Sequence, residues 1–344
     1  LHSAEAAYAW LEDSSESLEG GVRLMSASLE STQCTVQDIL ESGREQRLGE
    51  LAKGLKGEYQ GGVQKARTQR MAAAQALVHG QPVRQGKSYL EGGNLLSGTR
   101  QDGSAYVLVG ADSLEIAWHQ LKQSKPGATL EEAKAIVASD LGVSVEQLYS
   151  IEQPGAFHLD MRMMPIGPGK MALQDSREAA ALHLEWLRQE GVGGAQLDRM
   201  AKKLENWVNA RAPLEDLAAR DLQAAGLEVH RLAGVFLNFQ ERDSEVVNFF
   251  NSRHGVSPQG VRYSILMGGP PQAESYFATQ LLEQIKAPID RLYFLDPSQT
   301  APTLKLMGGL KCRSKLLGQR AAHQVATEFV AGPVSQGLQL ALAL

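Results

Sequence analysis

Beyond about residue 88 the chain alternates short strand-like segments with helix-like ones, and this alternation restricts the fold more than any other feature of the sequence. Residues 95–99 and 105–109 are both strand-like, and the turn signal Asp102-Gly103 lies between them. Glycine supplies 34 of the 344 residues, which suits many tight turns. We therefore expect a mixed α/β fold with small sheets and intervening helices, rather than one parallel sheet.

Two regions look mainly helical. In residues 1–80, apolar side chains recur at helix-like spacing between glycine pairs, and residues 176–226 form a helical block. We expect a helical N-terminal region over residues 1–87, an α/β domain over residues 88–330 that contains the helical block as an insertion, and a C-terminal tail over residues 331–344.

Local signals mark several helix ends. Thr129, followed by two glutamates, predicts the start of a helix that runs to residue 141. Ser176 is expected to cap the helix that begins the helical block, and Pro213 is expected to end a segment within it.

The composition argues against several classes of protein. Acidic residues outnumber basic ones by 39 to 34, and a net charge of −5 argues against a basic nucleic-acid-binding protein. The longest apolar run near an end, residues 338–344, is too short to span a membrane. The chain shows no secretory signal pattern. Because it begins at Leu1 and not at a methionine, we expect a domain of a longer protein. A reducing compartment such as the cytoplasm is expected, with a secreted effector or toxin as the alternative.

Three segments carry residue types that perform chemistry, and the first is Glu91-Gly92-Gly93-Asn94. Its two glycines allow backbone conformations that would present the flanking glutamate and asparagine into an open space. By itself, the segment is most simply interpreted as a turn with polar ends.

The second segment is His158-Leu159-Asp160, in a strand-like context. Residues i and i+2 of a strand share a face, so His158 and Asp160 are expected to point the same way. An imidazole beside a carboxylate can act in acid–base chemistry at neutral pH. The alternative is a buried or paired histidine on a sheet.

The third segment, residues 308–314, holds a cysteine between two basic residues. Lys311 and Arg313 flank Cys312, and positive neighbours favour the thiolate. Positive flanks would also repel a cationic substrate, but in a strand both would face away from the cysteine. Cys34, the other cysteine, lies in a helix-like segment and is expected to be structural or incidental. Two cysteines exclude a disulfide scaffold, and no zinc-ligand spacing accompanies them.

The order of these segments is more specific than any one of them. His158 follows Glu91 by 67 residues, and Cys312 follows His158 by 154. The order resembles that of the guanidino-group-modifying enzymes, which include arginine, agmatine and peptidylarginine deiminases, dimethylarginine hydrolases and glycine amidinotransferases. The resemblance covers about residues 88–320 and implies a five-bladed α/β propeller. Val247-Asn248-Phe249-Phe250 also resembles a strand that precedes the last blades in that family.

The resemblance implies a reaction that needs no metal and no organic cofactor. Cys312 would attack the central carbon of a guanidinium, His158 would transfer the proton, and Asp160 and Glu91 would bind the N–H groups. The expected catalytic residues are Cys312, His158 and Asp160, lying within a few ångströms of one another at one end of a central cavity. The remaining substrate-binding residues are expected to be Asn94, Asp112 and Arg162.

The sequence also departs from the family pattern. Members commonly carry histidine just before the cysteine, where this chain has Lys311. Many carry an upstream aspartate that binds the guanidinium, but residues 59–90 contain no acidic residue. Glu91, Asp112 or another carboxylate takes that role, or the site is altered.

Other functions remain open at this point. The same Cys312 and His158 would serve a deamidase or a protease, and the resemblance includes amidinotransferases. A non-catalytic interaction protein on a decayed enzyme fold is a further alternative. If the protein is a deiminase, a guanidine within a protein is favoured over free arginine, because the helical regions and the basic stretch 59–90 offer docking surface. The sequence gives no expectation for the oligomeric state.

Overall fold

A computed structural model describes residues 15–17, 23–25, 80, 82–154, 158–237, 245–298, 300, 304 and 310–313. The chain divides into two compact units. The first comprises Leu1–Gly92, Ile116–Ser144 and Cys312–Leu344, and the second comprises Gly93–Glu115 and Val145–Lys311.

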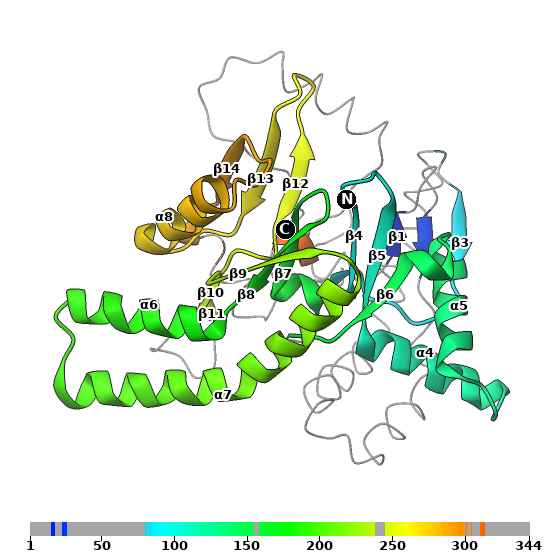
Figure 1. The fold of residues 1–344 in the computed structure, drawn as a ribbon, viewed down its shortest axis with the longest axis horizontal. Coiled ribbons are helices and arrows are strands. Elements are labelled where there is room, and N and C mark those ends of the chain that lie inside the picture. Colours follow the sequence, from blue (N-terminus) through cyan, green and yellow to red (C-terminus); the bar gives the residue numbers. More distant parts are fainter. Residues whose placement is uncertain are drawn as a thin grey trace, which may run out of the picture. The chain divides into compact units, whose positions relative to one another are not determined.

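Short strands alternate with helices along the described chain (Figure 1). The strands are β1 (Ser15–Ser17), β2 (Arg23–Met25), β3 (Val83–Gln85), β4 (Leu95–Thr99), β5 (Ala105–Gly110), β6 (Leu148–Ile151), β7 (Met163–Gly167), β8 (Lys170–Gln174), β9 (Glu228–Leu232), β10 (Val235–Leu237), β11 (Glu245–Asn248), β12 (Arg253–Val256), β13 (Arg262–Leu266) and β14 (Arg291–Phe294). The α-helices are α4 (Ala111–Ser124), α5 (Leu130–Leu141), α6 (Ser176–Gln189), α7 (Gly194–Ala224), α8 (Pro271–Thr279) and α10 (Leu310–Arg313). Short 3₁₀ turns are η5 (Gly92–Asn94), η6 (Val145–Gln147) and η7 (Leu159–Met161), and η8 (Gln280–Gln284) is a π-helical turn.

The strands form small separate sheets, which confirms the mixed α/β class expected from the sequence. Their orders are β1-β2-β3, β4-β5-β6, β7-β8-β9, β10-β11 and β12-β13-β14. In each three-stranded sheet the first two strands are antiparallel and the third is parallel to the second. A parallel partner requires a crossover, and helices lie in the crossovers that lead to β6, β9 and β14. The three-stranded sheets therefore share one connectivity, although the sequence shows no regular repeat.

The hairpin turn at Asp102-Gly103 is confirmed. Gly103 has a φ of +83°, which glycine adopts without strain, and its N–H donates to the Arg100 carbonyl at 3.0 Å. The capping box at Thr129 is also present, because its side chain accepts from the Glu132 N–H at 3.2 Å and the Glu132 carboxylate accepts from the Thr129 N–H at 3.0 Å.

The N-terminal region differs from the helical prediction wherever the structure describes it. Segments 15–17, 23–25 and 83–85 are strands that pair as the sheet β1-β2-β3, so the prediction of helix is wrong for them. Three-residue strands are too short to show a period of two in the sequence. The rest of residues 1–79 and the tail 331–344 lie outside the described residues.

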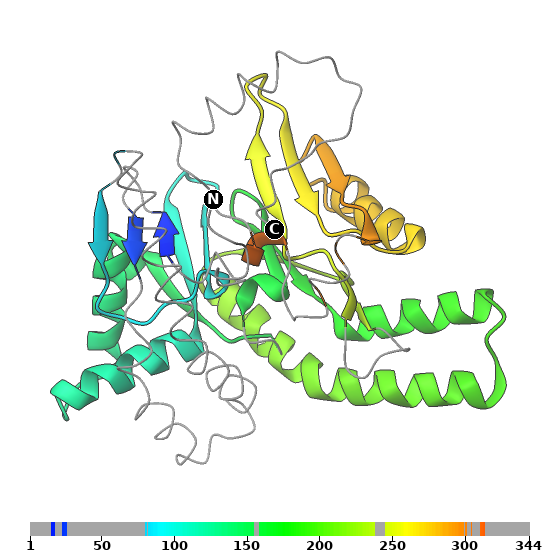
Figure 2. The same ribbon diagram turned by 180° about the vertical axis from the view of Figure 1, so that it is seen from behind.

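The helical block is confirmed as α6 and α7, which run side by side in both views of the chain (Figures 1 and 2). Two details were predicted wrongly. Asp175, not Ser176, caps α6, because its carboxylate accepts from the N–H groups of Arg177 and Glu178. Pro213 lies inside α7 and does not end a segment.

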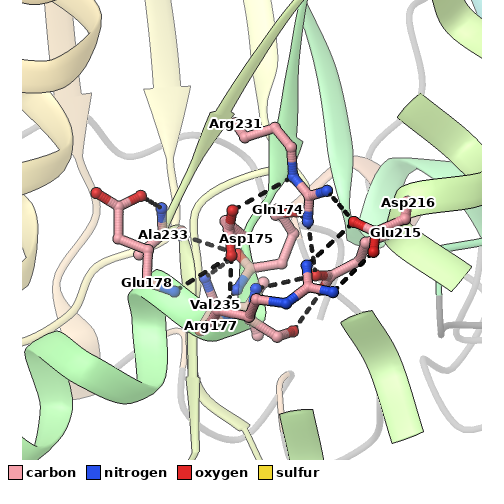
Figure 3. A network of polar contacts seen from close by, with 11 residues as sticks. Gln174, Asp175, Arg177, Glu178, Glu215, Asp216, Arg231, Ala233 and Val235 are labelled. Atoms are coloured by element: carbon pink, nitrogen blue, oxygen red, sulfur yellow. Dashed lines mark hydrogen bonds and ion pairs between the residues drawn. The ribbon is translucent and has the colours of Figure 1, made fainter. Parts of the chain in front are cut away.

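A polar network fastens this helical pair to the sheet β7-β8-β9 (Figure 3). Arg231 on β9 reaches Asp175, Glu215 and Asp216. Glu215 on α7 is fully buried, and it also accepts from the Ser176 N–H at 2.9 Å. Burial raises the pKa of Glu215, although the Ser176 hydrogen bonds and the nearby arginines oppose that rise.

Two apolar clusters form the core of the second unit. One contains Phe249, Phe250 and Phe277, whose rings pack at centroid distances of 4.8 and 5.8 Å around Phe277. The other contains Leu159, Met163 and side chains of β5, β8 and α7. Burying one large apolar side chain contributes about 1.5–3 kcal/mol. Burial of Leu159 therefore helps to fix the positions of His158 and Asp160 on either side of it.

Candidate functional site

The His158-Leu159-Asp160 segment is a turn, which corrects the prediction that it is a strand. His158 is extended, with φ −123° and ψ 145°, and precedes the 3₁₀ turn η7. The Arg162 N–H donates to the Leu159 carbonyl at 3.0 Å, which closes the turn. The argument that residues i and i+2 share a face therefore does not apply here. The buried Leu159 pulls the segment into the core, and both His158 and Asp160 are buried beside it.

The glycine–asparagine segment lies directly against this turn. The Leu159 N–H donates to Asn94 Oδ1 at 3.2 Å. A Cβ placed on Gly93 would lie 2.2 Å from His158 Nδ1, so the imidazole packs on a backbone that only glycine leaves open. Two of the segments predicted to carry chemistry are thus brought together, at Gly93, Asn94 and His158.

Asp112, near the start of α4, is connected to the turn indirectly. Its N–H donates to Gln153 Oε1 at 3.3 Å, and its side chain is buried. A Cβ on Gly110 would lie 2.7 Å from Asn94 Oδ1 and 2.8 Å from Gln153 Nε2. Asp112 is therefore joined to Asn94 through the close packing of Gln153 and Gly110.

Asp160 faces a cation of its own chain. Its side chain is 1% exposed, and Lys311 Nζ lies 3.2 Å from Asp160 Oδ2. Among the residues that the structure describes, none donates a hydrogen bond to either carboxylate oxygen with good geometry. The ammonium group of Lys311 is thus the charge that compensates Asp160.

This placement corrects the expected position of Lys311. Residues 310–313 form the helical turn α10 rather than a strand, so the alternation that would turn Lys311 away does not exist. The Lys311 N–H donates to Asn251 Oδ1 at 2.7 Å, and Arg253 Nη2 donates to the Lys311 carbonyl at 3.1 Å. These two contacts fix the backbone from which the ammonium group reaches Asp160.

Two asparagines that the sequence analysis did not select complete this environment. Asn248 and Asn251 are fully buried, and Asn248 Nδ2 donates to the Met161 carbonyl at 3.1 Å. Asn248 Oδ1 accepts from the Phe250 N–H at 3.2 Å and the Asn251 N–H at 3.3 Å. The segment 248–251 therefore binds η7 through Asn248 and the backbone of Lys311 through Asn251. Two asparagines three residues apart on either side of Phe249-Phe250, at the end of β11, were the signal that could have found them.

Arg162 lies close enough to α7 for its charge to act on Glu215. It is buried, and its positive charge is among the influences that lower the pKa of Glu215 on α7 against the larger effect of burial. This placement supports a structural contribution, and substrate binding by Arg162 stays a prediction.

Glu91 and Cys312 belong to the first unit. Glu91 is buried and accepts a hydrogen bond from the Tyr89 hydroxyl. The structure describes the backbone of Cys312 within α10. Gly308, Gly309, Ser314 and Cys34 lie outside the described residues.

The described residues have two further properties that bear on function. No group of three His, Cys, Asp or Glu side chains within them is placed to hold a metal ion. None of their helices combines the length and apolarity needed to cross a membrane.

Comparison with known proteins finds similarity among solved structures. No protein-family model matches the chain, and no curated protein matches it. Among solved structures, C. jejuni agmatine deiminase is similar, with a TM-score of 0.43 and 12% sequence identity. The match covers 73% of this chain and 62% of the deiminase chain, so it spans less than two thirds of that protein.

Proposed function

We propose that the protein is a cysteine-dependent hydrolase of the deiminase type that acts on a guanidinium group. The observation that carries the proposal is Asp160, a buried carboxylate beside His158 whose compensating charge is an ammonium group. A guanidinium is a planar cation whose N–H groups suit a carboxylate acceptor. The order of the three motifs along the chain adds independent support.

We also propose that the small sheets are blades of a propeller-like core. Its support is the shared connectivity of an antiparallel pair followed by a parallel strand. The sheet β1-β2-β3, which precedes residue 88, has the same connectivity. The pair α6–α7 is an insertion in the crossover that leads to β9.

The proposed reaction proceeds in two halves. The thiolate of Cys312 forms a bond to the guanidinium carbon, and the amine that leaves takes a proton from His158. This step gives a thiouronium adduct and ammonia. In the second half, His158 removes a proton from water, which attacks the same carbon, and the carbon–sulfur bond breaks to release a ureido product. Asp160 and Glu91 would hold the guanidinium N–H groups throughout.

The test is turnover with a matched pair of cysteine variants. The protein is incubated with arginine-containing peptides, free arginine and agmatine, and ureido product and ammonia are measured. Cys312→Ala is expected to lower turnover by at least about 10³-fold, because the nucleophile is lost. Cys34→Ala is expected to keep turnover within twofold. Retention of activity by Cys312→Ala would overturn the mechanism.

The substrate preference rests on the same assay. We propose a protein-bound or otherwise large guanidine, and the exposed surface of α6 and α7 is one support. Higher kcat/KM with an arginine peptide than with free arginine or agmatine is the expected result, and the opposite order would contradict it.

A non-catalytic binding protein is the second candidate. The observation that favours it is Lys311, which fills the position beside Asp160 where a cationic substrate would bind. Guanidine binding without any ureido product would support this candidate over the hydrolase.

A further inference from the structure

The Lys311 ammonium group uses the acceptors that a substrate cation would need. It lies 3.2 Å from Asp160 Oδ2 and donates to the Leu95 carbonyl at 3.3 Å. A carboxylate and a backbone carbonyl together are suitable acceptors for two N–H groups of a guanidinium. The Lys311 side chain is 12% exposed, so this is a buried contact and not a surface ion pair.

The backbone of Lys311 is fixed on both sides of the residue. Its N–H is bound by Asn251, which is itself buried, and its carbonyl is bound by Arg253. Asn251 and Asp160 are linked in turn, because Asn251 Nδ2 contacts Met161 Sδ at 3.6 Å and Met161 follows Asp160. The position of the ammonium group therefore follows from the fold rather than from a flexible side chain alone.

We propose that Lys311 is a built-in competitor that occupies the cation-binding position of Asp160 and must be displaced before a guanidinium can bind there. A guanidinium that binds Asp160 Oδ2 and the Leu95 carbonyl needs the acceptors that Lys311 uses, and two cations placed there would repel each other strongly where water is scarce. The choice of guanidinium as the competing cation rests on the proposed function. The ion pair between Lys311 and Asp160 is observed independently of the proposed function.

This arrangement makes Lys311 a determinant of specificity. A small guanidine offers few contacts beyond its cation, so displacement of Lys311 consumes much of its binding energy. A larger substrate makes further contacts away from the reacting group, and that energy can drive the displacement. Lys311 thereby selects against small guanidines and in favour of large ones.

The experiment measures binding of methylguanidinium, with neutral methylurea as the uncharged probe of similar shape. Titration calorimetry at pH 8 compares the unsubstituted protein with Lys311→Met, which keeps the side-chain length without its charge. Lys311→Met is expected to bind methylguanidinium at least about tenfold more tightly, with methylurea binding unchanged. Lys311→Arg, which retains the cation, is expected to bind as weakly as the unsubstituted protein.

Lys170→Met is the matched control, since Lys170 also pairs with a carboxylate, Glu228, at 3.6 Å but lies at a more exposed position. It is expected to leave the dissociation constant within twofold. An unchanged or weaker dissociation constant for Lys311→Met would overturn the proposal. Equal tightening of methylguanidinium binding by Lys170→Met would overturn it as well.

Loss of Lys311 leaves Asp160 buried without a counter-charge, so Lys311→Met is also tested by chemical rescue. If the variant is unstable, millimolar methylguanidinium is expected to raise its melting temperature, whereas methylurea does not. Absence of rescue in an unstable variant counts against the proposal. Tighter binding of methylguanidinium by Lys311→Met, without turnover of any guanidine, would support the role of Lys311 as a competitor and contradict the proposed hydrolase. Turnover without tighter binding would support the hydrolase and contradict the role of Lys311.

Discussion

At the residue scale, the contact between Gly93 and His158 leaves no room for a methyl group. A Cβ on Gly93 would lie 2.2 Å from Nδ1, so the imidazole would have to move within a packed site. We expect Gly93→Ala to lower the free energy of unfolding by about 1–3 kcal/mol, as overpacking does, and to misplace His158. Urea unfolding measures the first effect.

Gly127→Ala is the control for this substitution, because a Cβ there meets no heavy atom within 4 Å. It is expected to leave the unfolding free energy within about 0.5 kcal/mol. Equal effects of the two alanines would mean that the close approach to His158 carries no cost.

The sequence identified His158 and Asp160 but not the geometry that joins them. A two-residue spacing occurs in a strand and in a 3₁₀ turn alike, and only the burial of Leu159 in the core decides between them. Lys311 shows the same limit. Its charge is visible in the sequence, but its pairing with Asp160 depends on contacts between segments 151 residues apart.

At the element scale, Asp216 links α7 to α6 and β9. Its carboxylate pairs with Arg177 at 2.7 Å and with Arg231, and the Arg177 hydrogen bonds lower the pKa of Asp216 to about 2. A lowered carboxyl pKa stabilises the fold above the unfolded value of 3.8, and that stabilisation is lost as the pH falls toward 2.

Asp216→Asn is therefore expected to destabilise the protein at pH 7 and to have a much smaller effect at pH 2. Because Asp216 is 44% exposed, we expect a loss of about 1 kcal/mol or less at pH 7. Urea unfolding across this pH range measures the difference, with the exposed Asp198→Asn on the same helix as control. A difference as large at pH 2 as at pH 7 would contradict the assignment.

Helices were the elements that the sequence predicted best. The helix after Thr129 carries its own capping box, and α6 and α7 have long apolar periods, so local signals were sufficient. The strands β1, β2 and β3 have three residues each, and β3 pairs with β2 across 57 intervening residues. The local preference of proline predicts a helix end at Pro213, but tertiary packing can keep a helix continuous through a proline, as in α7.

At the scale of the whole molecule, each three-stranded sheet has a middle strand that is paired on both sides. In β8, residues 171–173 are fully buried, whereas Val256 on the edge strand β12 is 65% exposed. We expect amides of β8 to exchange with solvent at least about 100-fold more slowly than those of β12. Hydrogen-exchange mass spectrometry tests this, and equal protection of the two strands would contradict it.

The alternation of hairpins and helices predicted the fold class, but not the repeated connectivity. Helices of different lengths occupy corresponding crossovers, so no fixed sequence period exists to be detected. The candidate site has the same limitation, since Asn94, Asp160 and Lys311 come from three segments that approach one another only through packing.

The repeated connectivity also has a kinetic consequence. Assembly of each three-stranded sheet requires closure of one crossover, which spans 24 residues before β14, 37 before β6, 53 before β9 and 57 before β3. Closure entropy grows only with the logarithm of length, so the longest crossover costs about 0.8 kcal/mol more than the shortest. Each sheet can therefore form from its own stretch of chain as that stretch leaves the ribosome, without waiting for the remainder of the protein.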